Sequence, residues 1–118
     1  MSRDWGLYWD DILVACRKVM RYISGLDKDT FLRDERTYDA VLRNLEVIGE
    51  AVKGIPEDVR ARLPGIEWRK IAGLRDVIAH GYFGVDNEIL WNIVIEKIPE
   101  LLSKLESIDP DREWNRSE

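Results

Sequence analysis

Histidine, cysteine and long apolar runs are all scarce in this chain of 118 residues. The one cysteine, Cys16, can form no internal disulfide, which fits a reducing compartment. One histidine and one cysteine are too few for a zinc site, and no calcium-binding loop of the Asp-x-Asp-x-Asp-Gly type is present. No apolar run approaches the roughly 20 residues of a membrane-spanning helix, and the first residues lack the apolar core of a secretory signal. We therefore expect a cytoplasmic protein with no metal, no other cofactor and no membrane contact.

The sequence also lacks the motifs of several common kinds of enzyme. It has no Gly-x-x-x-x-Gly-Lys or Gly-x-Gly-x-x-Gly loop to cradle a nucleotide phosphate, and no Gly-x-Ser-x-Gly elbow to present a nucleophilic serine. Cys16 falls in helical register with Ile12 and Val19, which favours a core thiol over a reactive one. Metal-independent acid–base chemistry is the class of catalysis that remains.

Negative charge predominates, with a formal net charge of −5, which argues against a general nucleic-acid binder. Residues 60–75 are the exception, because they carry five basic side chains and one acidic one, a local charge of +4. The basic members are Arg60, Arg62, Arg69, Lys70 and Arg75. Such a cluster can be a solvated helix face, or it can bind phosphate, with Arg69 and Lys70 as candidate contacts to RNA. An acidic body around a small basic cleft favours local RNA contacts over wide wrapping of a nucleic-acid backbone.

Apolar residues recur every three or four positions along the chain, a period typical of helices, and no alternating strand pattern occurs. One stripe predicts a first helix from Tyr8 to Ile23, and a second, capped by Asp34, predicts a long helix that ends near Gly54. Further helices are predicted at 67–79 and 87–107, with short helical segments at 29–33 and 56–62. The predicted fold class is all-α, an antiparallel four-helix bundle with a short connecting helix. We expect residues 1–108 to form this helical domain and residues 109–118 to form a polar C-terminal tail.

Two residues inside the predicted helices indicate irregular packing. A glycine such as Gly49 costs about 1 kcal/mol relative to alanine in a helix, which indicates a close crossing with another helix at that point. Pro99 lacks the N–H that would bond to Ile95, so we expect this proline to kink or split the last helix.

Residues 75–82 hold the only histidine, five residues after an arginine and two before a tyrosine. Arg75 and Tyr82 are about two helical turns apart, so a continuous helix would place them on one face. His80 would point about 140° away, but Gly81 lets the backbone turn and redirect it. A histidine at a helix end can be structural, as a cap or a hydrogen-bond partner. Beside a permanent cation and a phenol, it instead predicts a site for acid–base chemistry on a phosphate.

The spacing Arg-x4-His-x-Tyr, followed by Phe83-Gly84-Val85-Asp86, resembles the HEPN superfamily and, within it, the HepT-like ribonuclease toxins. Residues 39–51 resemble the second-helix block of that family, and residues 66–74 resemble its run-in to the motif. An arginine and a histidine five residues apart would be a weak signal alone, but three blocks in the same order make the resemblance specific. Many relatives have asparagine after the arginine, where this chain has Asp76, which is a small departure from the pattern.

The resemblance implies a HEPN-like bundle that acts as a metal-independent endoribonuclease, with Arg75 and His80 as catalytic residues and the RNA 2′-OH as nucleophile. It implies a homodimer with the active site at the subunit interface, where two histidines supply both an acid and a base. It also implies a partner, an MntA-like nucleotidyltransferase antitoxin that AMPylates Tyr82. A phosphate added beside Arg75 would occupy the phosphate site and repel RNA.

Several side chains keep more than one interpretation at this stage. Tyr82 can orient substrate, pack, or accept the modification. Glu46 and Glu50 lie on one stripe with Arg43, which predicts either ion pairs within that helix or a supporting role near the catalytic cleft. A supporting role is also open to Asp76. The alternative to a nuclease is a non-catalytic HEPN interaction subunit that binds a nucleotide or docks onto a nucleotidyltransferase.

Overall fold

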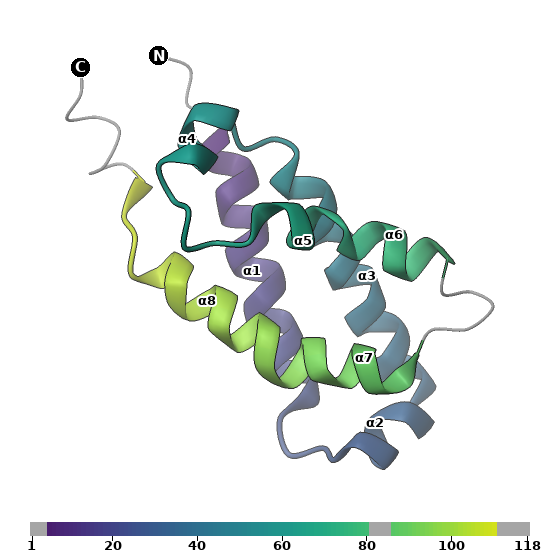
Figure 1. Ribbon diagram of the computed structural model, residues 1–118. Helices are drawn as coiled ribbons and strands as arrows, with labels where there is room; N and C mark the ends of the chain where they lie inside the picture. Colours follow the sequence, from purple (N-terminus) through teal and green to yellow (C-terminus); the bar gives the residue numbers. More distant parts are fainter. Residues whose placement is uncertain (1–4, 81–85, 111–118) are drawn as a thin grey trace.

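The computed structural model describes residues 5–80 and 86–110, and every regular element within these ranges is a helix (Figure 1). In chain order the elements are α1 (Trp5–Ile23), α2 (Lys28–Arg33), α3 (Glu35–Val52), α4 (Glu57–Ala61), α5 (Trp68–Ala72), α6 (Leu74–His80), α7 (Asn87–Asn92), the π-helical segment η2 (Ile93–Lys97) and α8 (Ile98–Glu106). Helices α1 and α3 lie side by side in opposite directions, α5 and α6 cross α3, and η2 and α8 pack on α1. The predicted all-α bundle of four principal helical segments is confirmed.

Aspartate side chains cap three of the helices in the described residues, α2, α3 and α7. The Asp34 carboxylate accepts a hydrogen bond from the backbone N–H of Thr37 at 3.1 Å, and Asp27 accepts one from Thr30 at 2.8 Å. Each bond satisfies an N–H that has no partner in the first turn of the helix. Because hydrogen bonds favour the charged form, they hold the pKa of both carboxyl groups below the ordinary value. Asp34 therefore caps α3 as predicted.

The helix predicted at 67–79 is interrupted, and this corrects the sequence interpretation. It divides at Gly73 into α5 and α6. Gly73 is the C-cap of α5, with φ −70° and ψ −12°. Any residue can adopt this conformation, but glycine has a low helix propensity, which favours a helix end at this position. The interruption leaves α5 and α6 as two separate helices that both pack on α3.

Pro99 disturbs the last helix through a π turn instead of a break. The chain stays helical from α7 through η2 to α8, and η2 ends directly before Ile98 and Pro99. The N–H of Ile98 bonds to the carbonyl of Ile93, five residues back, which widens the turn ahead of the proline. The helix is therefore not split, and the π segment accommodates the missing N–H of Pro99.

One apolar core fills the space between the helices and contains most of the predicted stripe residues. Its largest fully buried side chains include Trp9, Phe31, Ile12, Leu45, Ile48, Ile55, Ile98 and Leu105. Cys16 is also buried there, and burial raises the pKa of its thiol to about 12, so the predicted core thiol is confirmed. No helix in the described part of the chain is long and apolar enough to cross a membrane.

Candidate functional site

At Gly49, α3 packs closely against the start of α6. A Cβ atom added at Gly49 would lie 3.1 Å from the backbone nitrogen of Arg75 and 3.3 Å from the carbonyl oxygen of Ile71. Both atoms are backbone, one from α5 and one from α6, so a larger residue could be accommodated only if α3 moved away from these helices. The predicted close crossing at Gly49 is therefore confirmed, and it brings Arg75 against α3.

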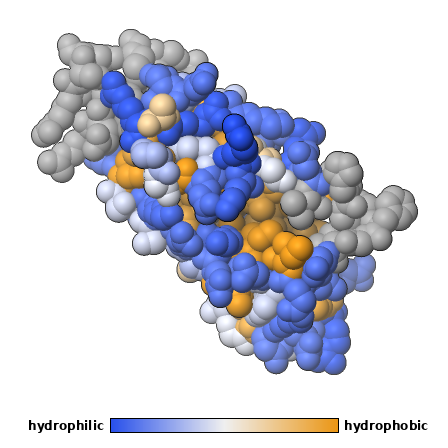
Figure 2. All heavy atoms as spheres, in the orientation of Figure 1, coloured by the Kyte–Doolittle hydropathy of each residue, from blue (hydrophilic) through white to orange (hydrophobic). Residues whose placement is uncertain are grey.

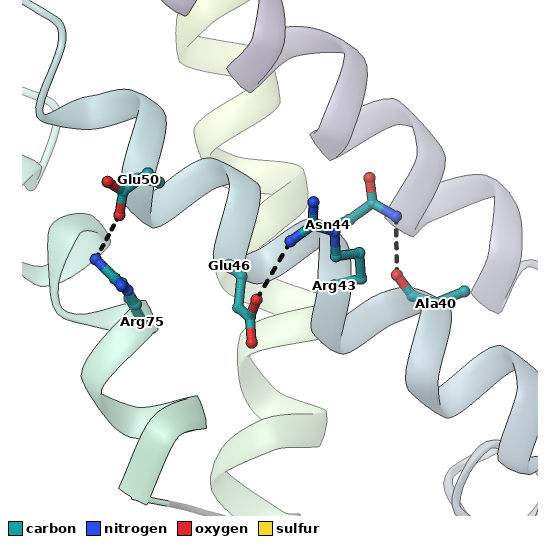
Figure 3. Close-up of polar contacts among 6 residues, drawn as sticks. All are labelled: Ala40, Arg43, Asn44, Glu46, Glu50 and Arg75. Carbon is teal, nitrogen blue, oxygen red and sulfur yellow. Dashed lines mark hydrogen bonds and ion pairs between the residues drawn. The ribbon is translucent and has the colours of Figure 1, made fainter.

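An ion pair with Glu50 holds the Arg75 side chain to α3 (Figure 3). Arg75 Nη1 donates to Glu50 Oε2 at 2.7 Å, and Lys53 Nζ lies 3.5 Å from the same oxygen. The Arg75 and Glu50 side chains are 53% and 59% exposed, so water screens their attraction and the pair orients the arginine more than it stabilises the fold. A guanidinium carries five N–H groups, so one bond to Glu50 leaves others that can bind a phosphate.

A hollow of about 290 Å³ lies beside this ion pair. It is lined by Tyr8 and Asp11 from α1, by Arg43, Glu46, Val47, Glu50 and Ala51 from α3, and by Arg75 from α6. Glu46 and Glu50 differ in their ion-pair partners, because Glu50 contacts both Lys53 at the end of α3 and an arginine outside α3. Glu46 forms a pair within α3, with Arg43 at 3.5 Å, whereas Glu50 reaches the arginine of another helix (Figure 3). Both line the hollow, and their supporting role stays a prediction.

Tyr8 and Asp11 are lining residues that the sequence did not reveal. The apolar period assigns Tyr8 to the inward stripe, but 43% of this residue is exposed. Its ring covers Gly54, where an added Cβ would overlap the ring atoms. Tyr8 therefore lies at the edge of the core, over the end of α3. The sequence around Tyr8 could not show that it is less buried than Ile12. The position of the end of α3 decides how deeply each of these residues is buried.

The predicted RNA contacts Arg69 and Lys70 lie on α5, outside the hollow. Lys70 Nζ is 2.7 Å from Glu67, and this contact raises the pKa of Lys70 and lowers that of Glu67. Lys70 also borders a separate groove of about 230 Å³, where apolar side chains reach the surface between α5 and the η2–α8 segment (Figure 2). Arg69 lines neither space, and Asp76 is exposed beside Arg75. A role for Arg69 or Lys70 in RNA binding stays a prediction.

His80 is the last residue of α6, five residues after Arg75 and one beyond the predicted end of the helix. The described part of the chain includes the backbone of His80 but not its side chain, and Tyr82 lies outside it. The predicted roles of these two residues are therefore untested by the geometry. Among the side chains that the structure does describe, no group of three or more His, Cys, Asp or Glu is placed to hold a metal ion.

An all-α bundle with an arginine fixed at a surface hollow, and a histidine at the end of the same helix, is the architecture expected of a HEPN protein. Sequence comparison agrees, because the ribonuclease HepT-like family matches residues 12–108. The chain therefore belongs to the ribonuclease HepT-like family of the HEPN superfamily. No solved structure gives a significant match.

Three relatives illustrate this similarity. A Methanocaldococcus jannaschii protein named a "putative RNase" is 44% identical over 112 residues, which cover 95% of this chain and 93% of the relative. A "probable ribonuclease HepT" of Thermococcus cleftensis is 42% identical and covers 92% of this chain and 98% of its own. A "putative RNase" of Caldanaerobacter subterraneus is 37% identical, with coverage of 86% and 90%. These names support ribonuclease activity for this chain at the level of the family.

Proposed function

We propose that this protein is a cytoplasmic, metal-independent endoribonuclease and the toxin of a toxin–antitoxin pair, with Arg75 and His80 as its catalytic residues. Membership of the ribonuclease HepT-like family supports the ribonuclease part of the proposal. The proposed site rests on the position of Arg75. Gly49 lets the backbone of Arg75 approach α3, and Glu50 binds its side chain at 2.7 Å beside a surface hollow. A permanently charged, oriented guanidinium suits the non-bridging oxygens of a phosphate.

The proposed reaction needs one proton removed and one proton supplied. The ribose 2′-OH loses its proton and attacks the neighbouring phosphorus, the bond to the 5′-oxygen breaks, and that oxygen takes up a proton. The products are a 2′,3′-cyclic phosphate and a 5′-hydroxyl. His80 is the side chain whose ordinary pKa suits both transfers near neutral pH. Arg75 stabilises the additional negative charge that develops on the phosphorane oxygens.

A homodimer would provide the second acid–base group that one chain lacks. The sequence has a single histidine, so one subunit can place only one imidazole at the scissile phosphate. Two subunits related by a two-fold axis bring together two copies of His80 and two of Arg75. One imidazole then acts as the base and the other as the acid.

The proposed antitoxin is an MntA-like nucleotidyltransferase that AMPylates Tyr82. Tyr82 follows His80 by two residues, so a group attached to its phenolic oxygen would add negative charge within a short distance of the catalytic pair. The added phosphate would compete with RNA for Arg75 and repel the RNA backbone. Intact-mass spectrometry after incubation with the nucleotidyltransferase, ATP and magnesium tests this step, with Tyr82→Phe as the control that keeps the ring and loses the acceptor.

The central experiment measures RNA cleavage by the full chain and by folded Arg75→Ala and His80→Ala variants, with and without a chelator. We expect each substitution to reduce cleavage about a hundredfold or more, the usual effect of losing an acid–base or oxyanion-stabilising group. Arg36→Ala removes an exposed arginine of α3 that lines neither space, and it should cleave at the wild-type rate. Full cleavage by folded His80→Ala would refute the mechanism. No cleavage by any form, together with nucleotidyltransferase binding, would favour the non-catalytic interaction subunit.

A further inference from the structure

The hollow beside Arg75 contains an aromatic ring and a carboxylate that the phosphate chemistry does not use. Tyr8 and Asp11 are three residues apart on α1, a spacing that puts side chains on one helix face roughly 5–6 Å apart at their Cβ atoms. Tyr8 is 43% exposed, and its ring is held against Gly54 at the end of α3. A flat, partly exposed ring packed against the backbone is a platform on which unpaired bases of RNA can stack.

The charges in the hollow leave Asp11 available for a ligand. Three carboxylates and two guanidinium groups line it. Glu46 pairs with Arg43 at 3.5 Å and Glu50 pairs with Arg75 at 2.7 Å, so both guanidinium groups already have an acidic neighbour. Within the described residues, Asp11 is the lining carboxylate that makes no ion pair or hydrogen bond through its side chain.

An ionised carboxylate only accepts hydrogen bonds, and this restricts which base it can bind. On their Watson–Crick edges, adenine and cytosine present a donor beside an acceptor, and uracil presents one donor between two carbonyl groups. Guanine alone presents two adjacent donors, N1–H and N2–H, which match the two oxygens of one carboxylate. The volume of about 290 Å³ is at the lower limit of small-molecule sites, roughly 300–1,000 Å³, and suits a single base.

We propose that this hollow is a guanine-binding subsite, in which Tyr8 stacks on the base and Asp11 accepts hydrogen bonds from its Watson–Crick edge. The assignment of an RNA ligand rests on the proposed function. Arg75 at the border of the same hollow would hold the phosphate attached to that nucleoside. The subsite would make the enzyme cleave next to guanosine in single-stranded RNA.

Calorimetric titration of the full chain with the four nucleoside 3′-monophosphates tests the subsite without relying on catalysis. We expect guanosine 3′-monophosphate to bind about tenfold or more tightly than the other three, consistent with a bidentate contact. Asp11→Asn keeps the volume but replaces one acceptor by a donor, so it should abolish the preference. Asp10→Asn is the matched control, because Asp10 is exposed on the same helix but does not line the hollow. Equal preference in the two variants would overturn the role of Asp11.

Tyrosine variants test the stacking platform separately. Tyr8→Leu still fills the space over Gly54 but lacks a flat ring, and it should weaken binding of all four nucleotides about tenfold, the range seen for lost base stacking. Tyr8→Phe should bind like the wild type, and so should Tyr22→Leu, which makes the same change on α1 outside the hollow. Wild-type affinity in a folded Tyr8→Leu protein would overturn the stacking role.

Cleavage assays then separate the subsite from the proposed function. Cleavage that depends on His80 but shows no guanosine preference, and no change in Asp11→Asn, would reject the subsite and leave the ribonuclease intact. Binding of guanosine 3′-monophosphate that depends on Asp11, in a protein without His80-dependent cleavage, would keep the subsite and reject the nuclease.

Discussion

Glu50 binds the guanidinium of Arg75 at 2.7 Å, one residue along α3 from the glycine that lets the backbone of Arg75 approach. Two consecutive residues of α3 thus do two different things for the same arginine. Gly49 sets the distance between the helices, and Glu50 sets the direction of the side chain. The bond orients the arginine at the border of a hollow before any phosphate binds. This lowers the entropic cost of ordering the side chain in the complex.

Glu50→Gln tests how far this orientation matters. The exposed ion pair is screened by water, so its loss should lower kcat/KM for RNA only about two- to fivefold, much less than Arg75→Ala. Glu46→Gln is the matched control, since Glu46 lines the same hollow but pairs with Arg43. Steady-state cleavage kinetics provide the measurement. An equal loss in both variants would show that the effect comes from the charge of the hollow and not from the bond to Arg75.

Gly49→Ala should destabilise the protein even though alanine is the better helix former. The added methyl group would meet backbone atoms of Arg75 and Ile71 within 3.1–3.3 Å, and overpacking of this kind costs about 1–3 kcal/mol. Gly6→Ala is the control, because nothing lies within 4 Å of a Cβ at Gly6, and it should be neutral or stabilising by up to about 1 kcal/mol. Urea unfolding measures both. Stabilisation by Gly49→Ala would mean that α6 can move away at little cost.

Cys16 should resist alkylation in the native protein at pH 8. Burial raises the pKa of this thiol to about 12, so almost no thiolate is present and the sulfur is covered. The pKa of the thiol is higher in the folded than in the unfolded protein. The contribution of this group to the free energy of unfolding is therefore fully present below the unfolded pKa and is lost as pH rises toward 12. Iodoacetamide labelling followed by mass spectrometry is the measurement, with urea-unfolded protein as the positive control. Rapid labelling of the native protein would contradict the buried environment.

Asp34→Asn should change the response of the fold to acid. Hydrogen bonds from Thr37 lower the pKa of Asp34 in the folded protein. The charged cap therefore stabilises the fold at pH values above the ordinary pKa near 3.8. This stabilisation is lost as pH falls through the lower pKa of the folded state. Asparagine also caps helices but does not titrate. Thermal unfolding at pH 7 and at pH 3 should therefore show a smaller fall in Tm for the variant. Asp39→Asn, an exposed change on α3 outside the cap, should retain the wild-type pH response.

The proposed dimer predicts complementation between two inactive subunits. Arg75→Ala and His80→Ala proteins, mixed and exchanged, should regain part of the cleavage activity if one site uses groups from both chains. Each variant alone, subjected to the same exchange, is the control. Sedimentation of a fully active monomer at micromolar concentration would rule out the shared site.

Local chemistry explains which parts of the fold could be predicted. Asp34 caps a helix because its side chain bonds to an N–H three residues away, and Gly49 is conspicuous because a glycine weakens the helix that contains it. The interruption at Gly73 was not predicted, since an apolar period continues across it from Ile71 to Leu74. Pro99 predicted an irregularity in the last helix. Whether the helix breaks or forms a π turn depends on how η2 and α8 pack against α1.

By itself, the sequence determined the all-α class, the main helices, the core thiol and the family, because each follows from periodicity, from neighbours a few residues apart, or from ordered motifs. Only the tertiary structure decided which residues surround Arg75. The sequence offers Glu50 a partner three residues away, Lys53, but does not show that it also reaches Arg75, and Tyr8 shares its stripe with buried residues. The crossing of α3 by α6 brings Arg75 to Glu50, and the end of α3 beneath the Tyr8 ring leaves Tyr8 at the edge of the core. Both are contacts between segments far apart in the chain, and helical periodicity carries no information about such distances.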